Sequence, residues 1–134
     1  KYAQMVENLD SAGLLSWRGF LKTSKLQSEL CHCRALINTP KWNEAYGNVV
    51  VEAMACGVPV VSYRKGGPSE IIQDGVTGFL VKPDSKEELL ESLKKINLID
   101  RFKCRRWVEN NASTNIFADK VENWLQKIIE NFNN

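Results

Sequence analysis

The residues of this chain that could do chemistry gather in the stretch NEAYGNVVVEAMACGVPVV, which begins at Asn43. It holds two carboxylates, Glu44 and Glu52, eight positions apart. If a helix begins near Gly47, its free amides and the positive end of its dipole form an anion site between the two acids. Eight residues at helical rise span about 12 Å. A phosphate at the helix start, with a carboxylate toward each end to accept hydroxyl protons, would suit a sugar nucleotide.

The valine run at 49–51 must be helical for this site to exist. Three β-branched residues alone favour a strand. The segment EAMAC that follows favours a helix, Gly57 supplies a left-handed stop, and a strand here would leave no crossover before the next parallel strand. We therefore predict a buried helix over residues 47–56, apolar on most sides. A plainer interpretation stays open, in which Glu44 interacts with the helix dipole and Glu52 is an exposed helix residue.

A second glycine feature, KGGPSE at residues 65–70, repeats the pattern of a strand, a tight loop and a helix start. Taken alone, it is typical of an ordinary turn between a strand and a helix, because glycine supplies the backbone freedom that such a turn needs. We expect Glu70 to organise the helix that follows.

The four cysteines are Cys31, Cys33, Cys56 and Cys104, and they lack the C-x2-C spacing of a zinc site. Their apolar or helical surroundings predict reduced, packed thiols. His32 is the only histidine and has no second cluster of ligands nearby, so we predict no metal site.

Length and composition exclude several classes of protein. A chain of 134 residues, 43% apolar and 25% charged, is typical of one globular domain. The net charge of +2 is too small to indicate a nucleic-acid partner, and the basic run at 101–106 is read as a solvated helix face. The sequence has no apolar run of about 18 residues. We expect a soluble, cytoplasmic protein and leave open peripheral association with the inner face of the cytoplasmic membrane.

The order of the predicted elements indicates an α/β fold. Strands are expected at 14–20, 35–38, 58–63 and 77–82, and helices at 2–9, 24–32, 69–73, 85–96 and 115–132. Ser85 and Glu88 form a capping-box pattern at the start of the helix over 85–96. This alternation predicts a mainly parallel sheet, with ligands bound at the carboxyl ends of its strands.

Taken together, EAYGNVVVEAMACGVPVV and GGPSEIIQDGVTGFLV resemble the donor-binding, carboxyl-terminal domain of retaining glycosyltransferases of the GT-B fold. The resemblance is to the group 1, or family 4, type, which includes bacterial O-antigen and lipopolysaccharide transferases. It covers roughly residues 14–96 and includes WRGF and LINTP in the family's order. It implies a Rossmann-like sheet and sugar transfer from a UDP- or GDP-sugar to a glycan or lipid-linked acceptor, without a metal or other cofactor.

The resemblance also implies roles for individual residues. Glu44, the candidate catalytic residue, approaches hydroxyls of the donor sugar, Glu52 holds the ribose hydroxyls, and Leu21 packs against the nucleobase. The two glutamates then act as positioning groups rather than as the acid/base pair of a hydrolase. The remaining donor-binding positions are backbone: Ala45, Tyr46, Gly47, Asn48 and Val49 cap the diphosphate, and Gly66 and Gly67 lie near the phosphates.

The chain lacks parts of the family's pattern. Members carry an amino-terminal acceptor domain and two further strands with an Arg and a Lys that neutralise the diphosphate, and Arg64 and Lys65 do not match those positions. We expect residues 1–98 to form the Rossmann-like part of an incomplete donor-binding domain and residues 99–134 its C-terminal helices. Unpaired sheet edges predict that the fragment self-associates or swaps its first segment, and that it is inactive alone.

Two alternatives come from other classes. A non-catalytic nucleotide-binding module, such as a receiver-like domain, is disfavoured because no acidic cluster follows the first predicted strand. An epimerase or phosphorylase with the GT-B architecture stays open.

Overall fold

The computed structural model describes residues 2–132 and has the α/β architecture that the sequence predicts. Its parallel sheet has the order β1-β2-β3, and Leu36 pairs with Val60, which pairs in turn with Gly78. The strands are β1 (Leu36–Asn38), β2 (Val60–Tyr63) and β3 (Gly78–Val81). The strands predicted at 35–38, 58–63 and 77–82 are therefore confirmed, each slightly shorter than expected.

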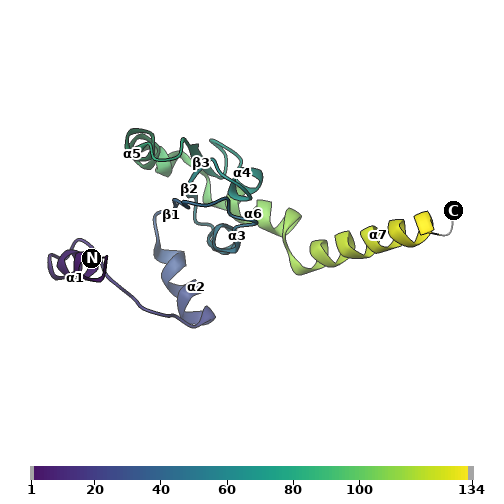
Figure 1. The fold of residues 1–134 in the computed structure, drawn as a ribbon, viewed down its shortest axis with the longest axis horizontal. Coiled ribbons are helices and arrows are strands. Elements are labelled where there is room, and N and C mark those ends of the chain that lie inside the picture. The colour runs from purple at the N-terminus through teal and green to yellow at the C-terminus, as the bar shows by residue number, and fades with distance from the viewer. Residues whose placement is uncertain (1, 133–134) are drawn as a thin grey trace.

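The helices follow the predicted order along the chain, and those in the middle of the chain pack against this small sheet. Figure 1 shows α1 and α7 at the two ends of the view, away from the sheet, and α7 leaves the rest of the chain from its junction with α6. The helices are α1 (Tyr2–Ser11), α2 (Thr23–His32), α3 (Asn48–Ala55), α4 (Pro68–Ile71), α5 (Lys86–Lys95), α6 (Arg101–Asn111) and α7 (Thr114–Phe132), with a 3-10 turn η1 (Ile96–Leu98) after α5.

Helix α3 contains the three valines, as predicted. Gly47 precedes it with a φ of 98°, and Gly57 follows it with a φ of 69°, so a residue in the left-handed region stands at each end. Val50 and Met54 are completely buried, and α3 packs against β1, β2 and α6. Val49 is 42% exposed, so the expectation of a helix buried on most sides is wrong for that face.

The central strand β2 is buried along its whole length, and α5 packs against β2 and β3. Ser85 caps α5 by accepting a hydrogen bond from the Glu88 amide at 3.3 Å, as predicted. The reciprocal hydrogen bond of a capping box, from the Ser85 amide to the Glu88 carboxylate, is not formed, so this part of the prediction is wrong. Because the Ser85 amide already donates to the Lys82 carbonyl at 3.2 Å, the Glu88 carboxylate accepts instead from the Lys82 amide at 2.7 Å.

The strand predicted over residues 14–20 is wrong. This segment crosses from α1 to α2 without regular structure, and Leu14, Trp17 and Phe20 are 78%, 71% and 96% exposed. An apolar segment becomes a strand only beside a partner, and within residues 2–132 no strand pairs with it. Strand β1 is therefore a sheet edge, where Ile37 is 50% exposed. Pairing of this edge with a second copy stays a prediction.

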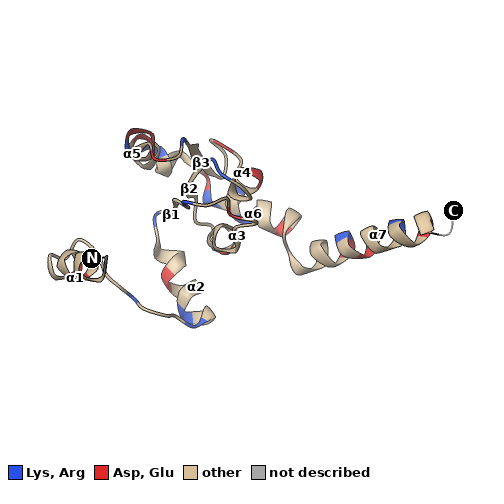
Figure 2. Ribbon diagram, viewed as in Figure 1, with Lys and Arg blue, Asp and Glu red and all other residues tan. Residues whose placement is uncertain are grey.

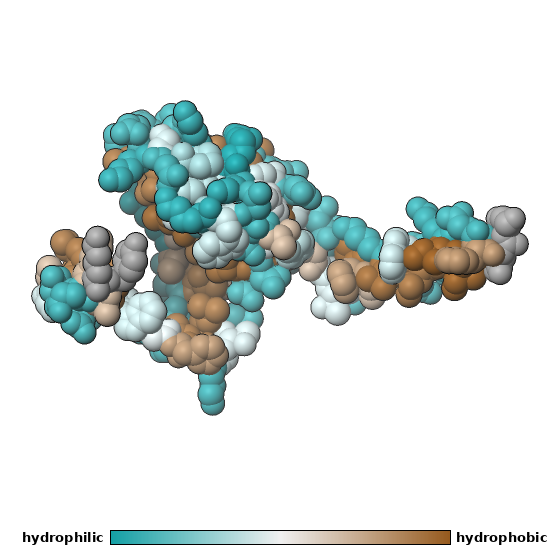
Figure 3. Space-filling model, in the orientation of Figure 1, coloured by the Kyte–Doolittle hydropathy of each residue, from teal (hydrophilic) through white to brown (hydrophobic). Residues whose placement is uncertain are grey.

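The tail helix predicted over residues 115–132 is confirmed as α7. Figure 3 shows a hydrophobic band along it, and Figure 2 shows basic and acidic residues interspersed on the same helix. In the part of the chain that the structure describes, no helix is both long and apolar enough to cross a bilayer. The exposed apolar side chains of α7 are Phe117, Val121, Trp124, Leu125, Ile129 and Phe132.

The packing of α3 predicts the effect of a core substitution. Met54→Ala removes a fully buried side chain, so we expect a loss of about 2–5 kcal/mol in the free energy of unfolding, measured by urea denaturation. Leu90→Ala on α5 is the control, since Leu90 is 58% exposed and its truncation should change stability by less than about 1 kcal/mol. Equal losses in the two variants would contradict the packing described here.

Candidate functional site

The loops that follow β1 and β2 are in direct backbone contact. The Gly67 amide donates to the Glu44 carbonyl at 2.7 Å. A Cβ atom on Gly66 would lie 2.3 Å from that same carbonyl oxygen, and one on Gly67 would lie 2.3 Å from the carbonyl oxygen of Tyr46. No residue larger than glycine fits at either position without moving the backbone. The glycine pair therefore fixes where residues 44–46 lie. From the sequence alone, this structural role could not be distinguished from a role in contacting phosphates.

The N-terminus of α3 opens beside these loops. Gly47 is buried, and its carbonyl accepts from the Val50 amide at 2.9 Å, which begins the helix. Among residues 2–132, the amides of Asn48 and Val49 donate to no protein acceptor. Free amides at the positive end of a helix dipole bind anions well. The structure thus places the five predicted backbone residues, 45–49, in one turn at the carboxyl end of the sheet.

Glu44 is held by a residue that the sequence analysis missed. Its carboxylate accepts a hydrogen bond from the indole nitrogen of Trp42 at 3.0 Å. Glu44 is half-buried and Trp42 is 65% exposed, so the pair lies at the surface of the loop after β1. The only feature of the sequence that could have indicated this bond is the position of Trp42, an aromatic hydrogen-bond donor, two residues before Glu44. This bond orients one carboxylate oxygen and leaves the other available for a ligand.

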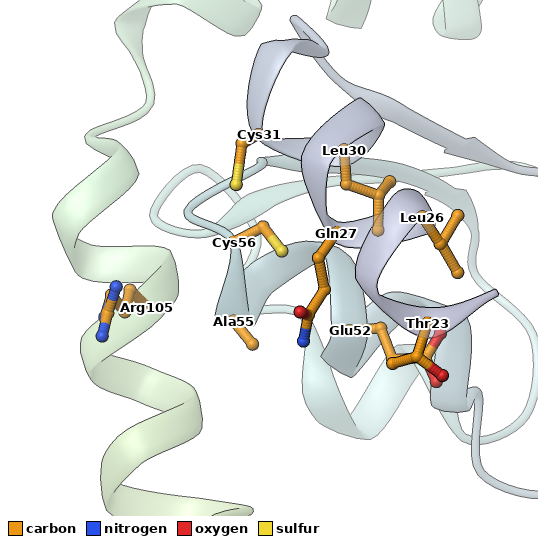
Figure 4. Close-up of a pocket in the computed structure, with 9 residues that line it drawn as sticks. All are labelled: Thr23, Leu26, Gln27, Leu30, Cys31, Glu52, Ala55, Cys56 and Arg105. Atoms are coloured by element: carbon orange, nitrogen blue, oxygen red, sulfur yellow. The ribbon is translucent and has the colours of Figure 1, made fainter. Parts of the chain in front are cut away.

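Glu52 lies one turn into α3 and lines a pocket of about 420 Å³ between α2, α3 and α6. Figure 4 shows Glu52 beside Thr23, which begins α2, at one end of this pocket. Leu21, the predicted nucleobase contact, is half-buried just ahead of α2 and is not among the pocket's lining residues. Glu44 does not line it either, so the two acids do not share this pocket.

The cations within these loops, Lys41, Arg64 and Lys65, are engaged by other protein groups. Arg64 contacts Asp74 at 3.0 Å, and the Lys65 ammonium donates to the Lys41 carbonyl at 2.8 Å. Lys41 also hydrogen-bonds Asp84 and thereby lowers the pKa of that carboxyl from its ordinary value. These contacts brace the loop after β1 against the turn before α5.

One polar atom near the glycine loop has no partner. The Ser69 hydroxyl, in the first turn of α4, is buried and makes no hydrogen bond within the described residues. A buried hydroxyl without a partner is costly unless a water molecule or a ligand satisfies it. The sequence offered no signal for this residue beyond its place in GGPSE. No group of His, Cys, Asp and Glu suited to a metal ion occurs in the described part of the chain.

The family to which this fold and site belong is established by sequence. The family model described as "Glycosyl transferases group 1" matches residues 1–114. This match covers most of the chain, including both glutamates and the glycine pair. The chain therefore belongs to the glycosyl transferases of group 1, as the resemblance in its motifs implied.

Curated relatives support the same family. The chain is 34% identical over 110 residues to a sucrose synthase of Acidithiobacillus caldus, in an alignment that covers 79% of the chain and 14% of that protein. It is 36% identical over 110 residues to sucrose synthase 6 of Arabidopsis thaliana, covering 78% of the chain and 11% of the relative. The chain thus spans a small part of the length of these relatives.

Solved structures share the fold. The Anabaena HepE protein in complex with UDP superposes with a TM-score of 0.80 at 22% identity, over 94% of this chain and 36% of that one. Sucrose-phosphate synthase from Thermosynechococcus elongatus superposes with a TM-score of 0.82 at 20% identity, over 96% of this chain and 34% of that one. Both agree with the GT-B donor-domain fold predicted from the motifs.

The contact between the two loops predicts a difference between two glycine substitutions. Gly66 and Gly75 have φ angles of 61° and 75°, but a Cβ atom meets Glu44 at the first and nothing within 4 Å at the second. Gly75→Ala should cost about 1–2 kcal/mol of stability from left-handed strain alone. Gly66→Ala should cost clearly more, because the loop must also move. Urea denaturation of both variants measures this, and equal losses would show that the loops do not need this close approach.

Proposed function

We propose that this chain is the donor-binding part of a retaining glycosyltransferase that moves a sugar from a nucleoside-diphosphate sugar to a glycan or lipid-linked acceptor. The observation that carries the proposal is the open N-terminus of α3, with Glu44 in the loop ahead of it and Glu52 one turn inside it. Membership of the group 1 glycosyl transferases supports it. So do the names of the HepE structures, which state complexes with UDP and with UDP-glucose.

In this proposal each group acts on a different part of the donor. The amides at the start of α3 donate to the diphosphate and stabilise the charge that develops as the nucleoside diphosphate departs. The Glu52 carboxylate accepts from the ribose hydroxyls, and Leu21 packs against the base. Glu44, oriented by Trp42, accepts from a hydroxyl of the donor sugar and holds the anomeric carbon in position for the acceptor. Neither acid needs to exchange a proton with the reacting atoms.

The donor base and the acceptor are the finer parts of the proposal. We propose a UDP-sugar as donor, because UDP and UDP-glucose are named in the HepE complexes, with a GDP-sugar as the alternative. The O-antigen or lipopolysaccharide acceptor rests on the motif resemblance alone. The relatives reported above are named for sucrose, so a soluble sugar is the alternative acceptor. Acceptor-binding groups would come from a further domain, and the reaction would take place in the cytoplasm or at the inner membrane face.

The role of Glu52 predicts weaker donor binding when its charge is removed. In a titration of the chain with UDP, followed by NMR chemical shifts, Glu52→Gln should raise the dissociation constant about tenfold or more, because hydrogen bonds to a charged acceptor are the stronger kind. Glu91→Gln on α5 is the matched control, since Glu91 is an exposed partner of Lys94 and should leave the affinity unchanged. Equal affinity of the Glu52 variant and the parent chain would remove Glu52 from the site.

The role of Glu44 predicts loss of transfer. The intact protein that contains this chain should move radiolabelled sugar from UDP-glucose to an acceptor, and Glu44→Ala should abolish the transfer. The 134-residue chain alone should show no turnover. Label that stays on the nucleotide in an altered sugar would indicate an epimerase, and label released as sugar phosphate would indicate a phosphorylase. Binding without any reaction would indicate a nucleotide-binding module.

A further inference from the structure

Two cysteines from different helices meet in the pocket that Glu52 lines. Cys31 lies in the last turn of α2, and Cys56 directly follows α3 as its C-cap. Both line the 420 Å³ pocket, and Figure 4 shows them together at the end opposite Thr23 and Glu52. They are 25 positions apart in the sequence, so only the packing of α2 against α3 brings them into one place. The sequence analysis predicted packed thiols here, but Cys31 is exposed, which corrects that expectation.

The Cys56 thiol is influenced by Cys31 and by a nearby cation. Burial is the largest cause that raises the pKa of Cys56, the neighbouring Cys31 thiol raises it further, and Arg105 of α6 opposes both by favouring the thiolate. The Glu52 carboxylate, from the far end of the pocket, also raises this pKa slightly. Cys31 is open to solvent and Cys56 is half-buried behind it. The pair thus has an accessible first thiol and a sheltered second one.

The other two cysteines lack this arrangement. The Cys33 thiol donates to the Glu29 carbonyl within α2 at 3.4 Å. Cys104 is completely buried and donates to the Thr77 carbonyl at 3.3 Å, and burial raises the pKa of its thiol to about 11. A fully buried thiol such as Cys104 is inert toward oxidants, and Cys33 is only half-buried but is engaged by a backbone carbonyl. An exposed thiol near a second thiol and a cation is reactive. Cys33 and Cys104 therefore serve as internal controls for the reactivity of Cys31 and Cys56.

We propose that Cys31 and Cys56 form a redox-modification site that closes into a disulfide between α2 and α3, by exchange with a small disulfide such as oxidised glutathione. The Cys31 thiolate attacks one sulfur of oxidised glutathione, which forms a mixed disulfide and releases one glutathione thiolate. The Cys56 thiolate then attacks the Cys31 sulfur and releases the second. Two protein thiols are oxidised to a disulfide, and one glutathione disulfide is reduced to two thiols. The two released glutathione thiolates take up the two protons that the protein thiols lose, so no net proton is released.

The bridge would have a defined structural effect. It would join the end of α2 to the end of α3 across the pocket and narrow the pocket at the end next to α6. Because it closes a long loop, it should also raise the midpoint of thermal unfolding by restricting the unfolded chain. The proposal does not depend on donor binding or on sugar transfer.

Peptide mapping tests the proposal. The reduced chain is incubated with oxidised glutathione, free thiols are blocked with iodoacetamide, and the chain is digested with trypsin. Residues 26–34 hold both Cys31 and Cys33, and residues 42–64 hold Cys56, so the assignment requires single variants. We expect a cross-link between these two peptides that persists in Cys33→Ser and Cys104→Ser and disappears in Cys31→Ser and Cys56→Ser. Dithiothreitol should reverse it.

Other products would overturn the proposal. A disulfide between Cys31 and Cys33 within one peptide, a cross-link to Cys104, or a stable glutathione adduct on Cys31 without closure would each show that the pair does not bridge. As a second readout, oxidised Cys33→Ser should unfold at a higher temperature than its reduced form, and Cys31→Ser should show no such shift. A shift of the same size in Cys31→Ser would also overturn the proposal.

Discussion

The close approach of two backbone loops at the carboxyl end of the sheet is the constraint on which the site depends. The Gly67 amide bonds to the Glu44 carbonyl, and neither Gly66 nor Gly67 has room for a side chain. This contact sets the path of the chain from the end of β1 into α3. It thereby decides where Glu44 points and leaves the first amides of α3 open. A residue with a Cβ atom at either glycine would separate the loops before any ligand arrived.

Helix α3 links this loop contact to the core. Its inner face, with Val50 and Met54, is fully buried, so the helix cannot shift without opening the core. Glu52, on its outer face, lines the pocket beside α2. Cys56, at its C-terminal end, lies next to Cys31. One short helix therefore positions an open N-terminus, a carboxylate and a thiol. Burial of Val50, Ala53 and Met54 holds all of these in place. Val50 is therefore tolerated in the helix despite the preference of valine for strands.

Three apolar surfaces of the chain are exposed to solvent. The exposed side chains of residues 14–20, the β1 edge at Ile37 and the band along α7 find no cover within residues 2–132. Patches of this kind indicate contact with other protein surfaces. The motif-bearing residues, by contrast, lie on the part that has its own core. The family match spans both, since it runs from residue 1 to residue 114.

The sequence by itself determined the family and the order of most elements, and it singled out the residues of the loops at the carboxyl end of the sheet. These predictions rest on local features of the sequence: the glycine positions, the helix caps and the spacing of Glu44 and Glu52. Such features can be recognised without knowledge of the fold. Tertiary structure decided the rest. Residues 14–20 are predicted as a strand but have no partner to pair with among residues 2–132. The contacts of Gly67 with Glu44 and of Lys41 with Asp84 depend on how loops meet. The neighbourhood of Cys31 and Cys56 likewise arises from helix packing, which no spacing along the chain encodes.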